Sequence, residues 1–274
     1  MPNAPDLIAP RRGPLIDCHS HIFTADMPPS DAPWSRPKYD FPVESYIKTL
    51  DAYGVMFGVI AGISIYGEYN DYMLEVLPRH RRLRGTVIPW ASMDRAAMDR
   101  MASGGIVGVR LQWGRIKDVP DLTTHYYQLL FRRIRDLDWH IHVSLYSPRL
   151  ELILPALEAA GIKFIIDHYG LPVEGPGLDC PGFKALVRSV GEGKATVKLS
   201  APFRIPGAAM AHEVAQTLLK AGGPSQLLWG SDCPFVGHES TIDYGTAIAD
   251  FEAAVPDAAA RRAIDENGLR FYLT

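Results

Sequence analysis

The chain has 274 residues, of which 47% are hydrophobic and 22% are charged, so it has enough apolar material for a globular core. Its formal net charge of −3 provides no bulk basic field that would favour nucleic acid. No stretch approaches the ~20 apolar residues of a membrane helix, and the first residues lack the apolar core of a signal peptide. These features exclude a nucleic-acid-binding or membrane-spanning protein at the level of composition.

The cysteines are few and scattered: Cys18, Cys180 and Cys233 form no Cys-x-x-Cys pair. An odd number of isolated cysteines is typical of reduced thiols in the cytosol, where disulfides are rare. We therefore expect a cytoplasmic protein and assign these thiols no chemistry.

Eight apolar, β-prone runs recur along the chain and predict strands at 15–21, 56–64, 83–90, 105–112, 140–146, 163–170, 195–201 and 227–232. Helical patterns alternate with them at 43–54, 70–80, 124–138, 148–161, 181–191, 208–223, 240–255 and 257–272. Gly54 is expected to stop the first helix, and Asn70 is expected to cap the second.

This alternation favours an α/β fold, because parallel strands need crossover connections and read as continuous apolar runs. Eight strand–helix units predict a (β/α)₈ TIM barrel formed by a single domain, 15–274, after an N-terminal extension, 1–14. The competing open, doubly wound sheet would favour a glycine-rich phosphate loop after the first strand. A proline-rich polar segment follows that strand instead, and we expect it to cover one end of the barrel.

Polar side chains stand at the same end of nearly every predicted strand, which is where barrel enzymes carry their chemistry. In chain order they are His19, His21, Ser64, Arg110, Gln112, Arg115, Tyr146, Asp167, His168, Ser200, Arg204, Ser231 and Asp232.

Three imidazoles and one carboxylate are expected to converge at that end. Side chains at positions i and i+2 of a strand share a face, so His19 and His21 point into the barrel mouth together. His168 and Asp232 follow the sixth and eighth strands. Such a cluster suits a zinc ion with a bound water, or a metal-free site in which imidazoles donate to a carbonyl while the carboxylate takes a proton from water.

A single His-x-His motif is more often structural than catalytic, and the chain holds a second example. His140 and His142 have the same spacing but lie at the start of a strand, so we assign them to packing or to the opposite face. His238, in the last strand's loop, fits either role. The convergence of these four side chains at the strand ends, and not the motif alone, favours a site.

Arginines gather at the same end. A buried guanidinium needs an anion, and for Arg110 that anion is either an internal carboxylate or a ligand. Arg110, Arg115 and Arg204 together exceed the carboxylates directed there, which favours an anionic, carboxylate-bearing substrate. Tyr146 and Ser64 would add neutral hydrogen bonds, and Trp90 and Trp113 either wall the pocket or belong to the core.

With these residues in place, the chain resembles the amidohydrolase superfamily, in its amidohydrolase 2 group, and within it the 2-pyrone-4,6-dicarboxylate lactonases and related lactonases. The motifs that carry the resemblance are IDCHSHIF, GVRLQ, WHIHVSLY, FIIDHYGLP, KLSAPFR, WGSDCP and NGLRFY. The resemblance implies a (β/α)₈ barrel in which His19, His21 and His168 polarise a lactone carbonyl.

The resemblance also implies that Asp232 activates water and later returns the proton to the leaving oxygen. It gives the role of holding substrate carboxylates and neighbouring oxygens to Arg110, Arg115, Tyr146, Arg204 and Ser64. The chain departs from the family after the eighth strand, where relatives often carry Asp-Trp-Pro-His and this sequence has Asp-Cys-Pro-Phe. The loops after the first and second strands also differ, so the resemblance does not identify the lactone.

Many amidohydrolases bind zinc, and the residues at the strand ends help to decide between a zinc site and a metal-free site here. The fourth and fifth strands end on Arg110 and Tyr146, where binuclear members carry a bridging lysine and a histidine, and arginine is not a normal ligand. A mononuclear zinc site on His19, His21, His168 and Asp232 is the alternative. The resemblance points to metal-free chemistry, so we expect no cofactor.

The sequence therefore predicts a metal-independent hydrolase that opens a carboxylated lactone in the catabolism of aromatic or sugar acids. Its expected partner is a small anionic lactone, with no nucleic acid and no membrane, and a homo-oligomer is compatible with the sequence. Two alternatives stay open: a zinc-dependent decarboxylase or hydratase on the same barrel, and a catalytically inactive dicarboxylate-binding protein.

Overall fold

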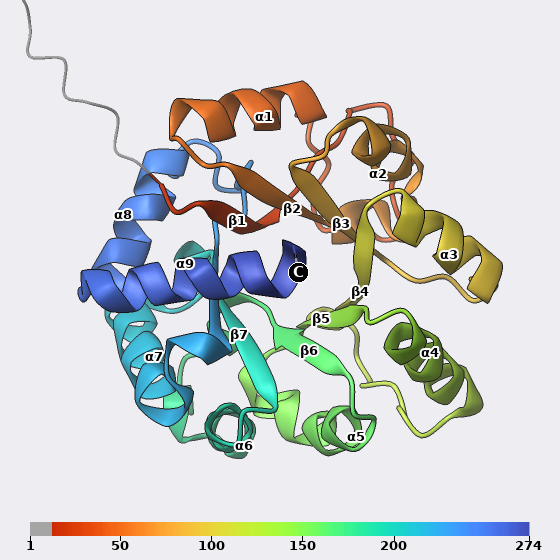
Figure 1. The fold of residues 1–274 in the computed structure, drawn as a ribbon. Helices are drawn as coiled ribbons and strands as arrows, with labels where there is room; N and C mark the ends of the chain where they lie inside the picture. Colours follow the sequence, from red (N-terminus) through yellow and green to blue (C-terminus); the bar gives the residue numbers. More distant parts are fainter. Residues whose placement is uncertain (1–12, 274) are drawn as a thin grey trace, which may run out of the picture.

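Eight parallel strands form a barrel in a computed structural model that describes residues 13–273 (Figure 1). The strands are β1 (Ile16–Ser20), β2 (Phe57–Ala61), β3 (Leu83–Val87), β4 (Ile106–Gln112), β5 (His140–Ser144), β6 (Lys163–Ile166), β7 (Ala195–Ser200) and β8 (Leu227–Gly230). Each pairs with the next in chain order. The segment after β8 returns to β1, because the Asp232 amide donates to the His19 carbonyl at 2.8 Å. The predicted (β/α)₈ barrel is confirmed.

Helices surround the barrel in the order that the connections require. They are α1 (Val43–Ala52), α2 (Asp71–Val76), α3 (Arg95–Ser103), α4 (His125–Asp136), α5 (Leu154–Ala159), α6 (Pro181–Gly191), α7 (Gly207–Gly222), α8 (Tyr244–Ala254) and α9 (Ala258–Leu273). The last of these, α9, lies across the end of the barrel at which the strands begin (Figure 1). Most of the predicted N-terminal extension, 1–14, lies outside the described residues.

The structure corrects the sequence interpretation in three places. Helix α3 was not predicted, because only Met98 and Met101 are buried along it, and its clearest signal is the side chain of Asp94, which caps the amide of Ala97. The helix predicted at 148–161 is interrupted, with a 3₁₀ segment before α5 and a proline near the start of each part. Asn70 precedes α2 without capping it, because its side-chain amide pairs with the backbone of Ile88.

The interior of the barrel is divided along its axis. Near the strand starts it is apolar, where Val59, Ile165 and Leu228 pack with Tyr272 of α9. Nearer the strand ends, charged side chains replace this apolar layer, including the fully buried Lys198 and Asp167. A carboxylate or ammonium in such a place is stable only with partners, so the polar half of the barrel must be internally connected.

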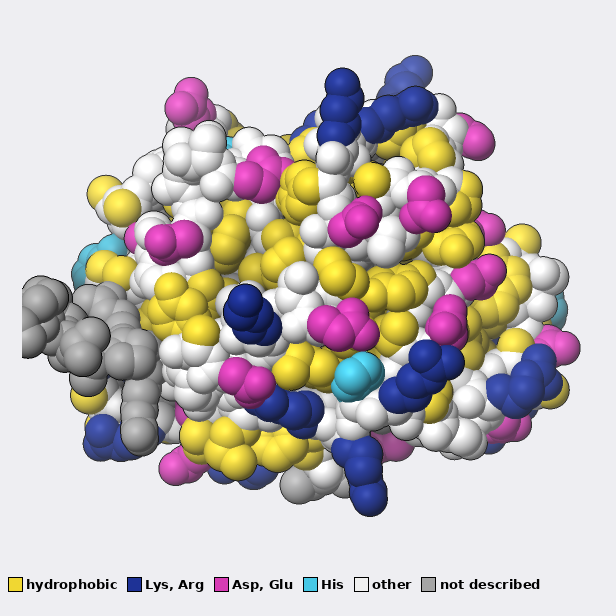
Figure 2. All heavy atoms as spheres, turned by 90° about the horizontal axis from the view of Figure 1, so that it is seen from above, with side chains coloured by type: hydrophobic (Ala, Val, Ile, Leu, Met, Phe, Trp, Pro, Cys, Tyr) yellow, Lys and Arg dark blue, Asp and Glu magenta, His cyan; other side chains and the backbone are white. Residues whose placement is uncertain are grey.

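The surface carries charges of both signs. Over the face in Figure 2, basic and acidic side chains intermingle with apolar ones, as the small net charge leads one to expect. Among the described helices, none combines the length and the apolar character needed to cross a bilayer. The three cysteines are free thiols and are buried, as predicted from their scatter.

Candidate active site

A cavity of about 320 Å³ opens at the carboxyl ends of the strands. Its lining contains most of the predicted site residues: His21, Ser64, Arg110, Arg115, Tyr146, His168, Arg204 and Asp232. His19 does not line it, since its side chain is fully buried directly beneath Asp232. A space of this size accommodates one small ring with a few substituents, at the lower end of the usual range for ligand pockets.

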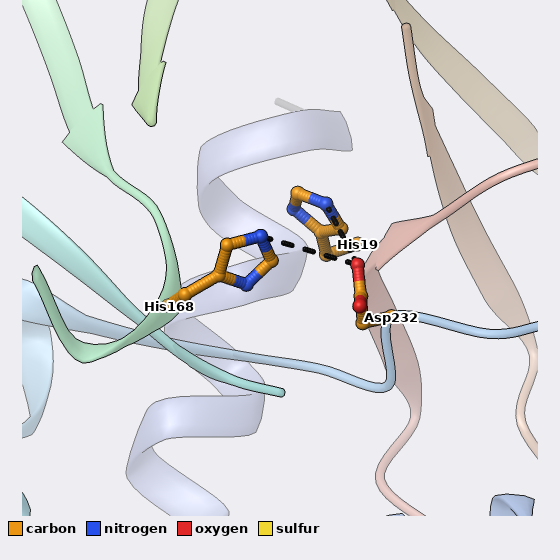
Figure 3. A group of neighbouring side chains, drawn as sticks. All are labelled: His19, His168 and Asp232. Atoms are coloured by element: carbon orange, nitrogen blue, oxygen red, sulfur yellow. Dashed lines mark ion pairs between the residues drawn. The ribbon is translucent and has the colours of Figure 1, made fainter. Parts of the chain in front are cut away.

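The three predicted imidazoles surround one oxygen of Asp232. The distances to its Oδ1 are 3.4 Å from His19 Nε2, 3.3 Å from His21 Nε2 and 3.9 Å from His168 Nε2. Figure 3 shows His19 and His168 approaching this carboxylate from different strands. The predicted convergence of these four side chains is therefore present.

The backbone turns sharply where it presents these groups. His168, Ala201 and Asp232 have φ values of 53°, 51° and 66°, in the left-handed region that non-glycine residues seldom occupy. These residues follow β6, β7 and β8, so the strain lies at the same end of the barrel as the cavity. Strained residues of this kind are typical of positions where the surrounding structure fixes a functional side chain.

Each imidazole has a second partner that determines which nitrogen carries its proton. His21 Nδ1 lies 2.7 Å from the carbonyl oxygen of Ala61, which only accepts, so His21 Nδ1 donates. His168 Nε2 lies 3.3 Å from Nη2 of Arg110, which only donates, so this nitrogen accepts. His168 Nδ1 then donates to Ser200 Oγ at 2.9 Å.

Burial keeps the imidazoles neutral, and neighbouring groups keep the carboxylate charged. Desolvation lowers the pKa of His168 to about 4 and also lowers the pKa values of His19 and His21. Burial alone would raise the pKa of Asp232, but the Arg204 guanidinium, together with His168 and His21, outweighs that effect and holds this pKa well below its usual range. At neutral pH the site therefore presents neutral imidazoles around an ionised carboxylate.

Arg110 is committed to internal partners. Its Nε donates to Asp167 Oδ2 at 2.9 Å and its Nη1 donates to the carbonyl of Gly62 at 2.9 Å. Of the two alternatives left open by the sequence, the structure therefore contains the internal salt bridge, although Arg110 still lines the cavity.

The outer wall contains a tryptophan that the sequence analysis missed. Trp34, in the proline-rich segment after β1, lies under two guanidinium groups, with Arg115 at 4.8 Å and Arg204 at 5.6 Å from its ring centroid. Its indole N–H donates to Ser64 Oγ at 3.0 Å. The available signal was an aromatic residue in a segment already expected to cover the barrel mouth.

A sequence model of the amidohydrolase family matches residues 16–272. The chain belongs to this family. One relative of the present amidohydrolase is 4-sulfomuconolactone hydrolase from Rhizobium radiobacter, 27% identical over 90% of this chain and 86% of the relative.

Two solved structures are similar over nearly the whole chain, and both are named as 2-pyrone-4,6-dicarboxylic acid hydrolases. The protein from Pseudomonas putida is 32% identical, with a TM-score of 0.86 over 95% of this chain and 99% of that one. The protein from Acinetobacter baumannii, with citric acid bound, is 26% identical, with a TM-score of 0.90 over 94% of this chain and 98% of that one.

Of the two roles that the sequence left open for Trp90 and Trp113, the structure contains core packing in this amidohydrolase. Trp113 is buried and packs edge-on against Tyr127, and Trp90 packs against the core, so neither lines the cavity. The corresponding walls include Phe203 and His238, whose ring centroids lie 4.8 Å apart. His238, which the sequence left open, thus borders the cavity.

Beneath the cavity lies a buried lysine that the sequence analysis did not single out. Lys198 Nζ, from β7, lies 3.2 Å from His19 Nδ1, 2.8 Å from His142 Nδ1 and 3.3 Å from Asp167 Oδ1. His140 and His142 are buried in the barrel, in agreement with the packing interpretation, and their Nε2 atoms are 2.9 Å apart. A single lysine in a strand with no other charged residue was the available signal.

The site fits a metal ion poorly, although His19, His168 and Asp232 have ligand-like spacing. Arg110 faces the lone pair of His168 Nε2, Arg204 holds Asp232, and Lys198 contacts His19. Three fixed cations thus contact the candidate ligands, against the two carboxylates Asp167 and Asp232. A divalent ion would add charge to an already cationic cluster in a place of low dielectric.

Proposed function

We propose that this amidohydrolase is a metal-independent lactonase that opens an anionic lactone ring. The observation that carries the proposal is the ionised Asp232, enclosed by three neutral imidazoles and facing a cavity bordered by arginines. The relatives named as hydrolases of sulfomuconolactone and of pyrone dicarboxylate support it, since both names denote anionic lactones.

The reaction begins when Asp232 takes a proton from water and the water oxygen attacks the lactone carbonyl. A hydrogen-bond donor in the cavity lining stabilises the oxyanion that forms, an interaction typically worth ~3 kcal/mol for a well-placed donor. The ring C–O bond then breaks, and the proton on Asp232 passes to the leaving oxygen. The product is an open-chain hydroxy acid, and the carboxylate of Asp232 is regenerated.

The resemblance gave all three imidazoles one role, that of polarising the lactone carbonyl. Their hydrogen-bond partners indicate that the imidazoles have different roles. A neutral His21 donates from Nδ1 to Ala61 and directs the lone pair of Nε2 toward Asp232. This lone pair suits the attacking water, which needs acceptors to orient it. His19, by contrast, has Nε2 directed at the same carboxylate from below.

Substrate anions would bind at the outer wall. Arg115 is exposed at the mouth and stacks on Trp34, which orients its guanidinium beside the cavity. Arg204 adds a second positive charge while pairing with Asp232. Tyr146 and Ser64 line the same cavity and supply hydroxyl groups for neighbouring oxygens.

No step of this mechanism uses a metal, because the fixed charges of Arg110, Arg204 and Lys198 already neutralise the two buried carboxylates. The alternative is a zinc-dependent decarboxylase or hydratase on the same barrel. Its requirement for metal separates it from the lactonase, and so does its product, since a decarboxylase releases CO₂.

The test is to assay the purified protein on mono- and dicarboxylated lactones and their neutral esters, with and without chelator, alongside elemental analysis. We expect hydrolysis of the carboxylated lactones at a rate that chelator leaves unchanged, and no stoichiometric zinc. Loss of activity with chelator, restored by zinc, would contradict the metal-free mechanism. Thermal stabilisation by dicarboxylates without turnover of any lactone would identify a binding protein instead.

A further inference from the structure

Lys198 lies beneath the cluster formed by the three imidazoles and Asp232. Its side chain points into the barrel, is fully buried, and ends between His19, His142 and Asp167. The apolar layer and Tyr272 of α9 close the barrel beneath it. No solvent reaches the ammonium in this position, so its protein contacts determine its behaviour.

An ammonium group donates three hydrogen atoms and accepts none. Any nitrogen that bonds to it must therefore offer a lone pair. His19 Nδ1 at 3.2 Å and His142 Nδ1 at 2.8 Å both meet this condition, and Asp167 Oδ1 at 3.3 Å supplies the third contact and the opposite charge. A neutral His19 held in this way carries its proton on Nε2.

Asp167 favours the other tautomer of His19, in which Nδ1 carries the proton. Its Oδ1 lies 3.5 Å from His19 Nδ1, close enough to accept a proton from that nitrogen when no cation competes. Asp167 and Lys198 thus compete for the same nitrogen of His19. Removing the ammonium would leave Asp167 as the neighbour and reverse the tautomer, so that a lone pair would face Asp232.

The direction of this proton matters because the other two neutral imidazoles do not present one. His21 donates from Nδ1 to Ala61, and His168 accepts at Nε2 from Arg110. The lone pairs of His21 and His168, and not their protons, face Asp232. His19 is therefore the imidazole of this cluster that can offer an N–H from Nε2 to Oδ1 of Asp232, 3.4 Å away.

We propose that Lys198 is a positioning residue that locks His19 in its Nε2–H tautomer and so makes it the donor that holds Oδ1 of the base Asp232 from beneath the cavity. The catalytic half of this statement rests on the proposed function, whereas the tautomer does not. The same ammonium occupies the space between His19, His142 and Asp167, three side chains whose ligand atoms have metal-like spacing. A tethered cation thus fills a position where a mobile one would otherwise find ligands.

The tautomer is measured directly by ¹H–¹⁵N correlation spectra of the histidine rings in the ligand-free protein, with His19 assigned from the signals lost in His19→Gln. We expect a pyridine-type shift at Nδ1 and a pyrrole-type shift at Nε2. In Lys198→Met, which keeps the unbranched shape of the side chain but removes the charged terminal group, the two shifts should exchange. His140→Gln is the matched control, because it alters the same buried column without contacting His19, and it should leave the His19 pattern unchanged.

Kinetics supply the second measurement. Lys198→Met should lower kcat about 10²-fold, because the general base Asp232 loses its buried donor, with KM for the lactone little changed. His140→Gln should retain the kcat of the wild-type protein. A purely structural role for Lys198 would instead lower the fraction of folded protein and leave the kcat of that fraction unchanged.

A pyrrole-type shift at Nδ1 of wild-type His19 would overturn the proposal, even if Lys198→Met fails to fold. An unchanged tautomer in a folded Lys198→Met variant would overturn it as well. If the wild-type protein opens no lactone, the proposed function fails, while the spectra still decide what Lys198 does to His19.

Discussion

Two His-x-His pairs lie within the same barrel and differ in nearly every property except their spacing. His19 and His21 have ring centroids 5.1 Å apart and nearly perpendicular planes, and both face the carboxylate of Asp232. His140 and His142 are stacked at 4.8 Å, and their partners are the ammonium of Lys198 and the hydroxyl of Tyr272.

The partners and the depth of each pair explain the difference. The first pair meets an ionised base at the edge of an open cavity, where water and substrate can enter. The second pair is enclosed by β-strands and α9, where its hydrogen bonds can only stabilise the neighbouring buried side chains. Spacing alone thus places two imidazoles together, and the surrounding charges decide whether they take part in chemistry.

Removing the base should have the largest effect and would abolish the property that distinguishes the first pair. Asp232→Asn keeps the shape of the side chain but cannot take a proton from water, so we expect kcat to fall about 10³-fold, within the range for a general base. Substrate binding should survive, which steady-state kinetics and calorimetric titration of a carboxylated lactone would show. Turnover close to that of the wild-type protein would exclude Asp232 as the base.

Exchanging one imidazole of each pair sharpens the comparison. His21→Gln should lower kcat about 10²-fold with little loss of stability, because an acceptor for the attacking water is lost at a partly open site. His140→Gln should leave kcat unchanged and lower the free energy of unfolding by about 1–3 kcal/mol, since it disturbs a buried hydrogen-bond network. Urea unfolding and kinetics on both variants are the measurements, and the reverse pattern would break the comparison.

Acid should destabilise the protein through the buried imidazole of His168. Burial lowers its pKa to about 4 in the folded protein, with Asp232 and Asp167 opposing this shift and Arg110 and Arg204 adding to it. The unfolded chain, with an ordinary pKa near 6.5, then binds more protons, so stability is full above about pH 6.5 and falls as the pH drops toward 4.

For His168 alone this loss amounts to up to about 3 kcal/mol. Urea midpoints measured across this pH range should show a shallower decline for His168→Gln than for the wild-type protein. His125→Gln, on the exposed start of α4, is the control and should follow the wild-type curve. Parallel curves for the wild-type protein and His168→Gln would contradict the prediction.

The barrel and most of the cavity lining could be predicted from the amino-acid pattern alone. Eight apolar runs with intervening helical patterns specify the fold because buried parallel strands tolerate few polar residues, and the polar residues that remain stand out at the strand ends. His19, His21, His168 and Asp232 were found in this way. Helix α3 was not predicted, because its few buried residues give only a weak apolar periodicity.

The tertiary structure alone decided which charges neighbour one another. Arg110 forms an internal salt bridge with Asp167, and the ring of Trp34 stacks with the guanidinium groups of two arginines. Lys198 contacts His19 although the two residues are 179 positions apart in the sequence. Periodicity along a strand reports which face a side chain occupies, but the protonation of an imidazole depends on atoms within about 3 Å of it. Those atoms belong to other strands, and only closure of the barrel brings them together.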